Sequence, residues 1–229
     1  MKLIITRPQE DCASISAALR ERGHEVVLSP LIKITPRLDV VVPAMPYQAV
    51  CLTSANAVRH LPTGVSRKLS AFTLGAQSAS AAAAAGFGHI EAKGGNVEGL
   101  AANVIRALKP ENGPLLYISG QETSGDLAGI LRKAGFSVVK LVAYDAVPLH
   151  LTLSAAEVAA CNGVLLYSKR SAKIWVEGIK RIDLFPRLSH FCLSAQIAQA
   201  LPAQWRIRAA QEPTESSLLA LIDIAAKEA

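Results

Sequence analysis

The feature that most constrains the fold of this chain is an internal repeat, in which four kinds of segment occur twice in the same order. Each later copy follows the earlier one by roughly 110 to 120 residues, and a constant order at such an offset indicates internal duplication. The pairs are residues 2–34 and 115–147, 49–61 and 163–175, 69–86 and 188–201, and 94–105 and 212–222. The chain is therefore predicted to contain two similar structural units.

The first segment shows what each unit contains. Residues 3–6 are an apolar run typical of a strand, and the following Arg7-Pro8-Gln9-Glu10 is typical of a helix start. The helix is expected to end at Gly23, and residues 25–28 are expected to form the next strand. This strand–helix–strand order predicts an α/β fold with parallel sheets that are covered by helices on both faces.

The repeat leaves the division into lobes open. The two lobes could follow one another with a boundary near residue 111. Alternatively, the middle of the chain could form one lobe and the two ends the other, with crossings near residues 35–38 and 147–151. Pro36 and Pro148 fit either arrangement.

Composition narrows the class of ligand. With 51% hydrophobic and 18% charged residues among 229, the chain is expected to fold around a substantial core. Its net charge is +6, but no run of Lys or Arg exceeds two residues, which favours a small anionic ligand over nucleic acid. No apolar run is long enough to span a membrane and no signal peptide is recognised, so we expect a cytoplasmic protein without a membrane partner.

The cysteines and histidines do not predict a metal site. Cys12, Cys51, Cys161 and Cys192 form no CxxC pair, and the five histidines are scattered along the chain. We expect four buried, reduced thiols and no bound metal.

Six strand-to-helix turns are the candidate binding elements. In parallel α/β sheets ligands bind beyond the carboxyl ends of strands, where helix N-termini present free N–H groups and a partial positive charge. Helix capping alone explains any one of these turns. Six of them, three per lobe and facing each other across a cleft, would form a pocket for a carboxylate or phosphate. The predicted binding residues are Thr6, Arg7, Ser54, Ala55, Gly75, Ala76, Gln77, Ser78, Ser119, Gly120, Gln121, Ser168, Lys169, Ser194, Ala195 and Gln196.

Familiar catalytic motifs are absent from the sequence. It has no dinucleotide-binding glycine pattern after a strand, no P-loop, no nucleophile elbow and no HExxH. An enzyme built on this chain would work mainly by binding and positioning a reactive substrate.

The ordered set of motifs resembles the uroporphyrinogen-III synthase family over essentially the whole chain. The segments that carry the resemblance are IITRP (4–8), LTSANAV (52–58), TLGAQSA (73–79), YISGQ (117–121), AGFSVVKLVAYDAV (134–147), LLYSKRSA (165–172), LSAQIAQAL (193–201) and PTESSLLALI (213–222).

The resemblance implies two flavodoxin-like lobes joined by a two-stranded connector. Residues 1–36 with 149–229 would form one lobe, and residues 38–147 the other. It also implies a cyclising lyase of haem biosynthesis. The enzyme would convert hydroxymethylbilane, a linear tetrapyrrole polycarboxylate, to uroporphyrinogen III through a spirocyclic intermediate that inverts ring D. No cofactor would be required, and the protein is expected to be a monomer.

The resemblance also assigns roles to residues. Tyr144 matches the recurrent cleft tyrosine and is expected to assist departure of the substrate hydroxyl. Ser54, Ser78 and Ser168 match small hydroxyl positions, and Arg7 and Lys169 are the expected partners of substrate carboxylates. The chain departs from the family pattern where many relatives have a Thr pair, because it has Gln196-Ile197 there. It also has Ala55 and Lys169 in place of a common proline, so backbone N–H contacts are expected at these turns.

Other functions remain open at this level. A nucleotide-sugar glycosyltransferase also has two α/β lobes, but it usually carries a glycine-rich loop that this chain lacks. A non-catalytic protein that closes around an anion, or a synthase-like domain without activity, would share the predicted fold.

Overall fold

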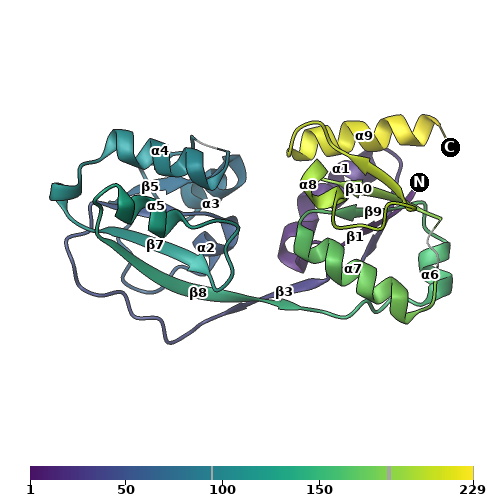
Figure 1. The fold of residues 1–229 in the computed structure, drawn as a ribbon, viewed down its shortest axis with the longest axis horizontal. Coiled ribbons are helices and arrows are strands. Elements are labelled where there is room, and N and C mark those ends of the chain that lie inside the picture. Colours follow the sequence, from purple (N-terminus) through teal and green to yellow (C-terminus); the bar gives the residue numbers. More distant parts are fainter. Residues whose placement is uncertain (94, 185–186, 229) are drawn as a thin grey trace. The chain divides into compact units, whose positions relative to one another are not determined.

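The computed structural model describes residues 1–93, 95–184 and 187–228. The chain divides into two compact units. Lobe one consists of Met1–Lys33 and Val147–Ala229, and lobe two of Ile34–Ala146. Each lobe has a predominantly parallel sheet with helices on both faces (Figure 1), so the predicted α/β fold with parallel sheets is confirmed.

Lobe one contains a sheet in which five strands are described, in the order β2-β1-β9-β10-β11. All of its strand pairs are parallel. Numbered along the chain within the lobe, this order is 2-1-3-4-5, the flavodoxin-like order. The strands are β1 (Lys2–Ile5), β2 (Glu25–Leu28), β9 (Gly163–Leu166), β10 (Ser189–Cys192) and β11 (Arg206–Ala209). The helices are η1 (Gln9–Asp11), α1 (Cys12–Glu21), α6 (Ala155–Ala159), α7 (Lys169–Arg181), α8 (Ala195–Ala198) and α9 (Glu215–Lys227).

Lobe two has the same spatial plan. Its described strands follow the order β8-β7-β4-β5-β6, with β3 added outside β8. The strands are β3 (Ile32–Pro36), β4 (Ala49–Leu52), β5 (Ser70–Thr73), β6 (Ile90–Glu91), β7 (Leu115–Gly120) and β8 (Val138–Pro148). The helices are α2 (Ala55–Arg59), α3 (Ala76–Ala84), α4 (Val97–Ala107), η2 (Pro110–Asn112) and α5 (Leu127–Lys133).

Strand register supports the duplication that the sequence predicts. Leu3 of β1 pairs with Gly163 of β9 and Val26 of β2, and Leu115 of β7 pairs with Ala49 of β4 and Val138 of β8. Strands β1, β2 and β9 of lobe one therefore correspond to β7, β8 and β4 of lobe two. In lobe one the two outer strands are supplied by opposite ends of the chain.

The chain passes between the lobes in β3 and in β8. The N–H of Arg37 donates to the carbonyl of Ala143, and the N–H of Leu149 donates to the carbonyl of Leu31. One residue number rises as the other falls, so the two strands run antiparallel. This pair is the predicted two-stranded connector.

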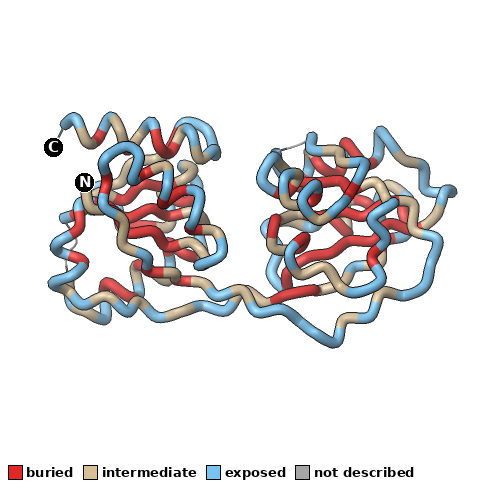
Figure 2. The backbone as a smooth tube through the Cα atoms, turned by 180° about the vertical axis from the view of Figure 1, so that it is seen from behind, coloured by how far each residue is buried: buried red, intermediate tan, exposed pale blue. Residues whose placement is uncertain are grey.

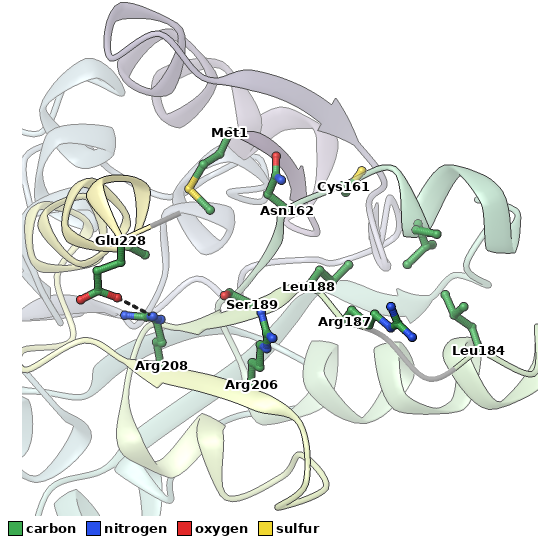
Figure 3. A pocket seen from close by; sticks show the side chains of 13 residues that line it. Met1, Cys161, Asn162, Leu184, Arg187, Leu188, Ser189, Arg206, Arg208 and Glu228 are labelled. Atoms are coloured by element: carbon green, nitrogen blue, oxygen red, sulfur yellow. Dashed lines mark hydrogen bonds and ion pairs between the residues drawn. The ribbon is translucent and has the colours of Figure 1, made fainter.

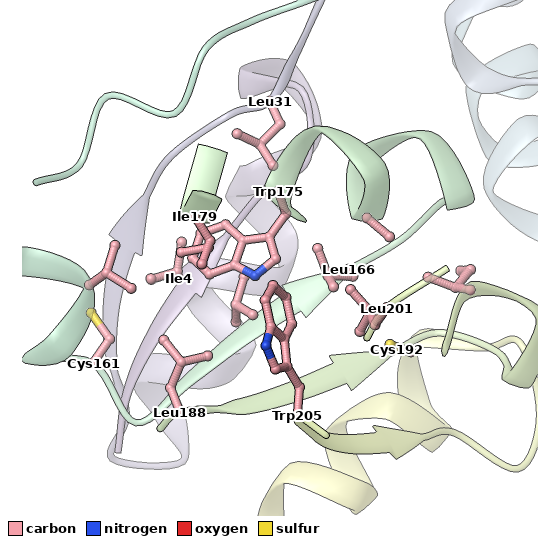
Figure 4. Packing of buried hydrophobic residues seen from close by; sticks show 14 residues of the cluster. Ile4, Leu31, Cys161, Leu166, Trp175, Ile179, Leu188, Cys192, Leu201 and Trp205 are labelled. Carbon is pink, nitrogen blue, oxygen red and sulfur yellow. The ribbon is translucent and has the colours of Figure 1, made fainter. Parts of the chain in front are cut away.

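Each sheet is buried on both faces, and Figure 2 shows mostly buried strands beside helices that have both buried and exposed residues. In lobe one, α1 and α9 cover one face around Leu3 and Ile5. The other face carries α7 and α8 and contains Trp175 and Trp205 (Figure 4). In lobe two, α4 and α5 cover one face, and α2 and α3 the other. Among the described residues, no helix combines the length and apolar character needed to cross a membrane.

Candidate functional site

The carboxyl edge of each sheet contains a point where neighbouring strands lead to helices on opposite faces. In lobe one these strands are β1 and β9, because α1 and α7 pack on different faces. In lobe two they are β7 and β4, because α5 and α2 do the same. Open α/β sheets bind ligands at such points. Residues at these two edges are therefore the candidates for function.

In lobe two, Tyr144 and Ser54 form a hydroxyl pair. The Tyr144 Oη lies 2.8 Å from Ser54 Oγ, and either oxygen can donate to the other. Ser54 is also the N-cap of α2, where its Oγ accepts the N–H of Ala57 at 3.0 Å. Tyr144 is 8% exposed. A phenol held in this way is positioned to exchange a proton at the carboxyl edge of the sheet.

The backbone directs Tyr144 toward α2. Ser119 of β7 pairs with Val142, whereas Gly120 pairs with Tyr144, so β8 contains one extra residue at this point. Such a bulge changes the direction of the side chains that follow it. A Cβ at Gly120 would lie 2.8 Å from the Tyr144 ring. Glycine is therefore required at position 120 for the ring to lie over β7.

Two further groups lie near this pair. The ring of His60 lies 6.0 Å from the ring of Tyr144. The Tyr117 hydroxyl lies 3.4 Å from Thr53 Oγ1, and burial raises the pKa of Tyr117. Sequence reasoning missed His60, because no motif connects the end of the short α2 with a tyrosine on β8.

The connector strands also meet at this edge through Arg37. Its Nε and Nη2 donate to the two carboxylate oxygens of Asp145, each at 2.8 Å. Its Nη2 also donates to Gln121 Oε1 at 3.0 Å, and the N–H of Gln121 donates to the Tyr144 carbonyl. Hydrogen bonding to Arg37 lowers the pKa of Asp145. In the sequence, the Arg37–Asp145 pair could have been suspected only from the positions of its members, because Arg37 follows Pro36 and Asp145 follows Tyr144.

In lobe one, the predicted carboxylate partner Arg7 already has a carboxylate. Its Nη1 lies 2.8 Å from Glu215 Oε2, its side chain is 12% exposed, and its guanidinium stacks 4.6 Å from the centre of the Tyr167 ring. Burial raises the pKa of Tyr167. A ligand carboxylate at Arg7 would have to compete with Glu215.

Several predicted hydroxyls are used inside the fold. Thr6 Oγ1 donates to the carbonyl of Leu165, and Ser119 Oγ donates to the carbonyl of Gly120. Ser168 caps α7. Its Oγ accepts the backbone N–H of Ser171, and Ser171 Oγ accepts the backbone N–H of Ser168. At these positions backbone groups are the more available ligand contacts.

The starts of α3 and α8 lack a side-chain cap. Gly75 and Ser194 are the N-caps of α3 and α8, and neither makes a side-chain capping bond. The first-turn residues Ala76 and Gln77 of α3 are exposed, as are Ala195 and Gln196 of α8 and Lys169 of α7, whereas Ser78 is buried. Helix α3 has nine residues and α8 has four, so α3 has the larger helix dipole.

One predicted turn is not a helix start. Residues Ser119 and Gly120 lie within β7, and α5 begins at Leu127, capped by Asp126. The prediction of helix N-terminal amides at Ser119, Gly120 and Gln121 is wrong. Pairing of β7 with β8 extends the strand through Gly120, and the helix starts where the Asp126 side chain accepts the Gly129 N–H. The expected α1 start is also preceded by the 3₁₀ turn η1.

All four cysteines are free and buried, as predicted. Within residues 1–93, 95–184 and 187–228, no three His, Cys, Asp or Glu side chains are grouped so as to hold a metal ion.

Comparison with known proteins gives one family. A family model described as uroporphyrinogen-III synthase HemD matches residues 13–220. A direct comparison with curated protein sequences gives no significant match.

Solved structures with a similar fold include two bacterial proteins. The uroporphyrinogen-III synthetase of Helicobacter pylori matches with a TM-score of 0.65 and 16% identity, over 96% of this chain and 97% of its own. A mutant uroporphyrinogen III synthase of the extremely thermophilic bacterium Thermus thermophilus matches with a TM-score of 0.52 and 13% identity, over 100% of each chain.

Proposed function

Because the chain belongs to the uroporphyrinogen-III synthase HemD family, we propose that it converts hydroxymethylbilane to uroporphyrinogen III. The proposed reaction is that of a cyclising lyase in tetrapyrrole biosynthesis. The terminal hydroxyl of the substrate leaves as water, and a spirocyclic intermediate then rearranges so that ring D is inverted. We propose that no cofactor takes part and that the protein acts as a monomer.

The observation that carries this proposal is the hydroxyl pair of Tyr144 and Ser54 at the carboxyl edge of lobe two. A leaving hydroxyl needs a proton to depart as water, and a phenol can donate one. In the proposed mechanism the Tyr144 Oη donates to the departing oxygen, and Ser54 holds the phenol in place. The ring lies against Gly120, which limits its movement on that side.

The carboxylates of the substrate are proposed to bind at helix starts and cationic side chains. The first turn of α3 presents amides without a side-chain cap, and Lys169 is an exposed cation at the start of α7. Both features favour an anion. The net charge of +6 acts in the same direction over a longer range.

The small number of candidate catalytic groups agrees with the proposed reaction. Hydroxymethylbilane closes unaided to the isomer in which ring D is not inverted. The enzyme must therefore mainly fix the geometry of a substrate that is already reactive. A single proton donor and several anion-binding positions are sufficient for that task.

The test is a coupled assay in which hydroxymethylbilane is generated in situ. The products are then oxidised and the uroporphyrin isomers separated by chromatography. We expect a shift from type I to type III that is lost when the protein is heated. If folded protein yields type I alone, the proposal fails. A non-catalytic anion-binding protein would then be the remaining interpretation, tested by calorimetric titration with the type I product.

A further inference from the structure

Lobe one contains a cavity of about 600 Å³ at the amino edge of its sheet. It lies where strands begin, because Met1, Asn162, Ser189 and Arg206 are among the residues that line it. The helix starts discussed above follow the carboxyl ends of the strands, so the cavity is at the opposite edge of the same sheet. Its volume falls within the range of about 300 to 1,000 Å³ that is usual for small-molecule sites.

The cavity combines an apolar floor with hydrogen-bond donors. Val158, Cys161 and Leu188 line it and also belong to the core cluster on the α7 face. Figure 3 shows the guanidinium of Arg206 beside Ser189. Asn162 uses its Oδ1 to accept the N–H of Lys2 at 2.6 Å, which leaves its amide nitrogen as a donor.

The three arginines that line the cavity differ in whether they have a carboxylate partner. Arg208 pairs with Glu228, with 2.7 Å between Nη2 and Oε2. Arg187 and Arg206, by contrast, have no carboxylate partner within the described part of the chain. Two guanidinium groups without counter-ions beside an apolar floor form a site for an anion. Guanidinium binds carboxylate or phosphate through parallel hydrogen bonds.

We propose that this cavity binds a small organic anion. A carboxylate or phosphate group would contact Arg187 and Arg206, and an apolar body would lie on Val158 and Leu188. The site is separate from the one proposed for catalysis, and it requires no step of that reaction.

The first test is calorimetric titration of the full chain with 1-naphthoate, 1-naphthyl phosphate and inorganic phosphate. We expect one saturable site for a naphthyl anion and binding at least tenfold weaker for inorganic phosphate. The stronger naphthyl ligand then identifies the acidic group. Equal affinity for inorganic phosphate and both naphthyl anions would overturn the organic class of ligand.

Charge-matched variants locate the site. Arg206→Gln and Arg187→Gln are each expected to weaken binding of the naphthyl anion at least tenfold. Arg106→Gln removes the same charge from the exposed face of α4, where Arg106 bonds Asn103 of its own helix, and should change the affinity less than twofold. Equal weakening by Arg206→Gln and Arg106→Gln would overturn the proposal, as would absence of saturable binding.

Cys161 provides a second readout that does not depend on a variant. Its thiol lines the cavity and donates to the Glu157 carbonyl, and burial raises its pKa. Bound naphthyl anion should slow alkylation of Cys161 at pH 8.5, measured by peptide mass spectrometry, without slowing that of Cys51 in lobe two. Unchanged alkylation of Cys161 at a saturating ligand concentration would contradict the site.

The isomer assay separates this inference from the proposed function. Arg206→Gln and Arg187→Gln should leave the ratio of type III to type I within twofold of the wild type. Binding of the naphthyl anion by a chain that forms type I alone would support the cavity and overturn the synthase proposal.

Discussion

The two lobes have the same strand arrangement but differ at the edges of their sheets. Ser54 and Ser168 occupy equivalent positions after β4 and β9, and both cap the helix that follows. In lobe two, the Ser54 hydroxyl also contacts Tyr144. In lobe one, the nearby edge is occupied by Arg7, which pairs with Glu215. The comparison shows that duplication kept the capping and pairing that form the sheet, while the side chains that can touch a ligand diverged.

The amino edges differ as well. The register of β10 with β11 pairs Ser189 with Arg206 and Phe191 with Arg208. In lobe two the equivalent pair joins Phe72 to Glu91. Where lobe one has an arginine on its last strand, lobe two has a glutamate. Arg208 lines the proposed anion cavity, so this part of its lining differs between the two copies.

The largest expected effect is on the rate of type III formation and compares Tyr144 of lobe two with Tyr167 of lobe one. Tyr144→Phe should lower the rate of type III formation by about 10²- to 10⁴-fold, because it removes a proposed proton donor. Tyr167→Phe should lower it by less than about threefold, because the ring that packs under Arg7 is retained. Isomer analysis of both variants at equal folded concentration makes this comparison.

Equal losses in the two variants would show that the lobes contribute similarly and that Tyr144 has no special role. Circular dichroism and thermal unfolding provide the control, because both substitutions keep the aromatic ring and should preserve the fold.

The next effect concerns acid stability and is confined to lobe one. His190 is fully buried, stacks 4.7 Å from the Trp205 ring and has its pKa lowered to about 4, chiefly by desolvation. In an unfolded chain a histidine titrates near pH 6.5. Protonation therefore favours the unfolded state as the pH falls from about 6.5 to about 4. The free energy of unfolding should decrease by about 2 kcal/mol between pH 7.5 and pH 5.

Tryptophan fluorescence is the suitable probe, because the chain's two tryptophans, Trp175 and Trp205, both lie in lobe one. In urea unfolding, His190→Phe should remove most of that pH dependence while keeping an aromatic partner for Trp205. The remainder belongs to other groups such as His24, whose pKa is also lowered by burial. The same pH dependence in His190→Phe would contradict the assignment.

A third effect comes from a difference of one methyl group between equivalent positions of the two sheets. Gly163 of β9 corresponds to Ala49 of β4, and a Cβ at Gly163 would lie 2.6 Å from the Phe191 ring and 2.9 Å from Leu3 Cδ2. Gly163→Ala should cost about 1 to 3 kcal/mol by overpacking. Urea unfolding followed by tryptophan fluorescence measures the change.

Ala49→Gly is the reciprocal variant and should cost about 1 kcal/mol or less, because it removes one methyl group and adds backbone freedom. No loss of stability in Gly163→Ala would mean that Phe191 can move aside, contrary to close packing of the lobe one core.

These comparisons also show how far the sequence predicts the structure. The repeat and the apolar runs predicted two parallel α/β units, because strand burial on both faces leaves a continuous apolar signal. The start of α5 was misplaced by several residues, since nothing local marks where the pairing of β7 with β8 ends. The small, polar composition of residues 119–126 is compatible with either a turn or an extended strand.

Pairs of interacting side chains were harder to predict from the sequence. Arg7 and Glu215 are separated by 208 residues, and Arg37 and Asp145 by 108. Such pairs depend on which strands become neighbours, and a repeat compatible with two chain divisions does not specify this. The β8 bulge that directs Tyr144 comes from a shift in the pairing register of β7 and β8, and no single residue in the sequence predicts that shift.

The smallest expected effect distinguishes capping from catalysis. Ser54→Ala and Ser168→Ala should each cost about 1 kcal/mol of stability, because each removes an N-cap. Ser54→Ala should in addition lower kcat for type III formation about tenfold with little change in KM, because Tyr144 loses the group that orients it. Ser168→Ala should leave kcat within about twofold. A similar kcat in both variants would make Ser54 a cap alone, and the two lobes would then differ at this edge in Tyr144 and not in the serine that both copies share.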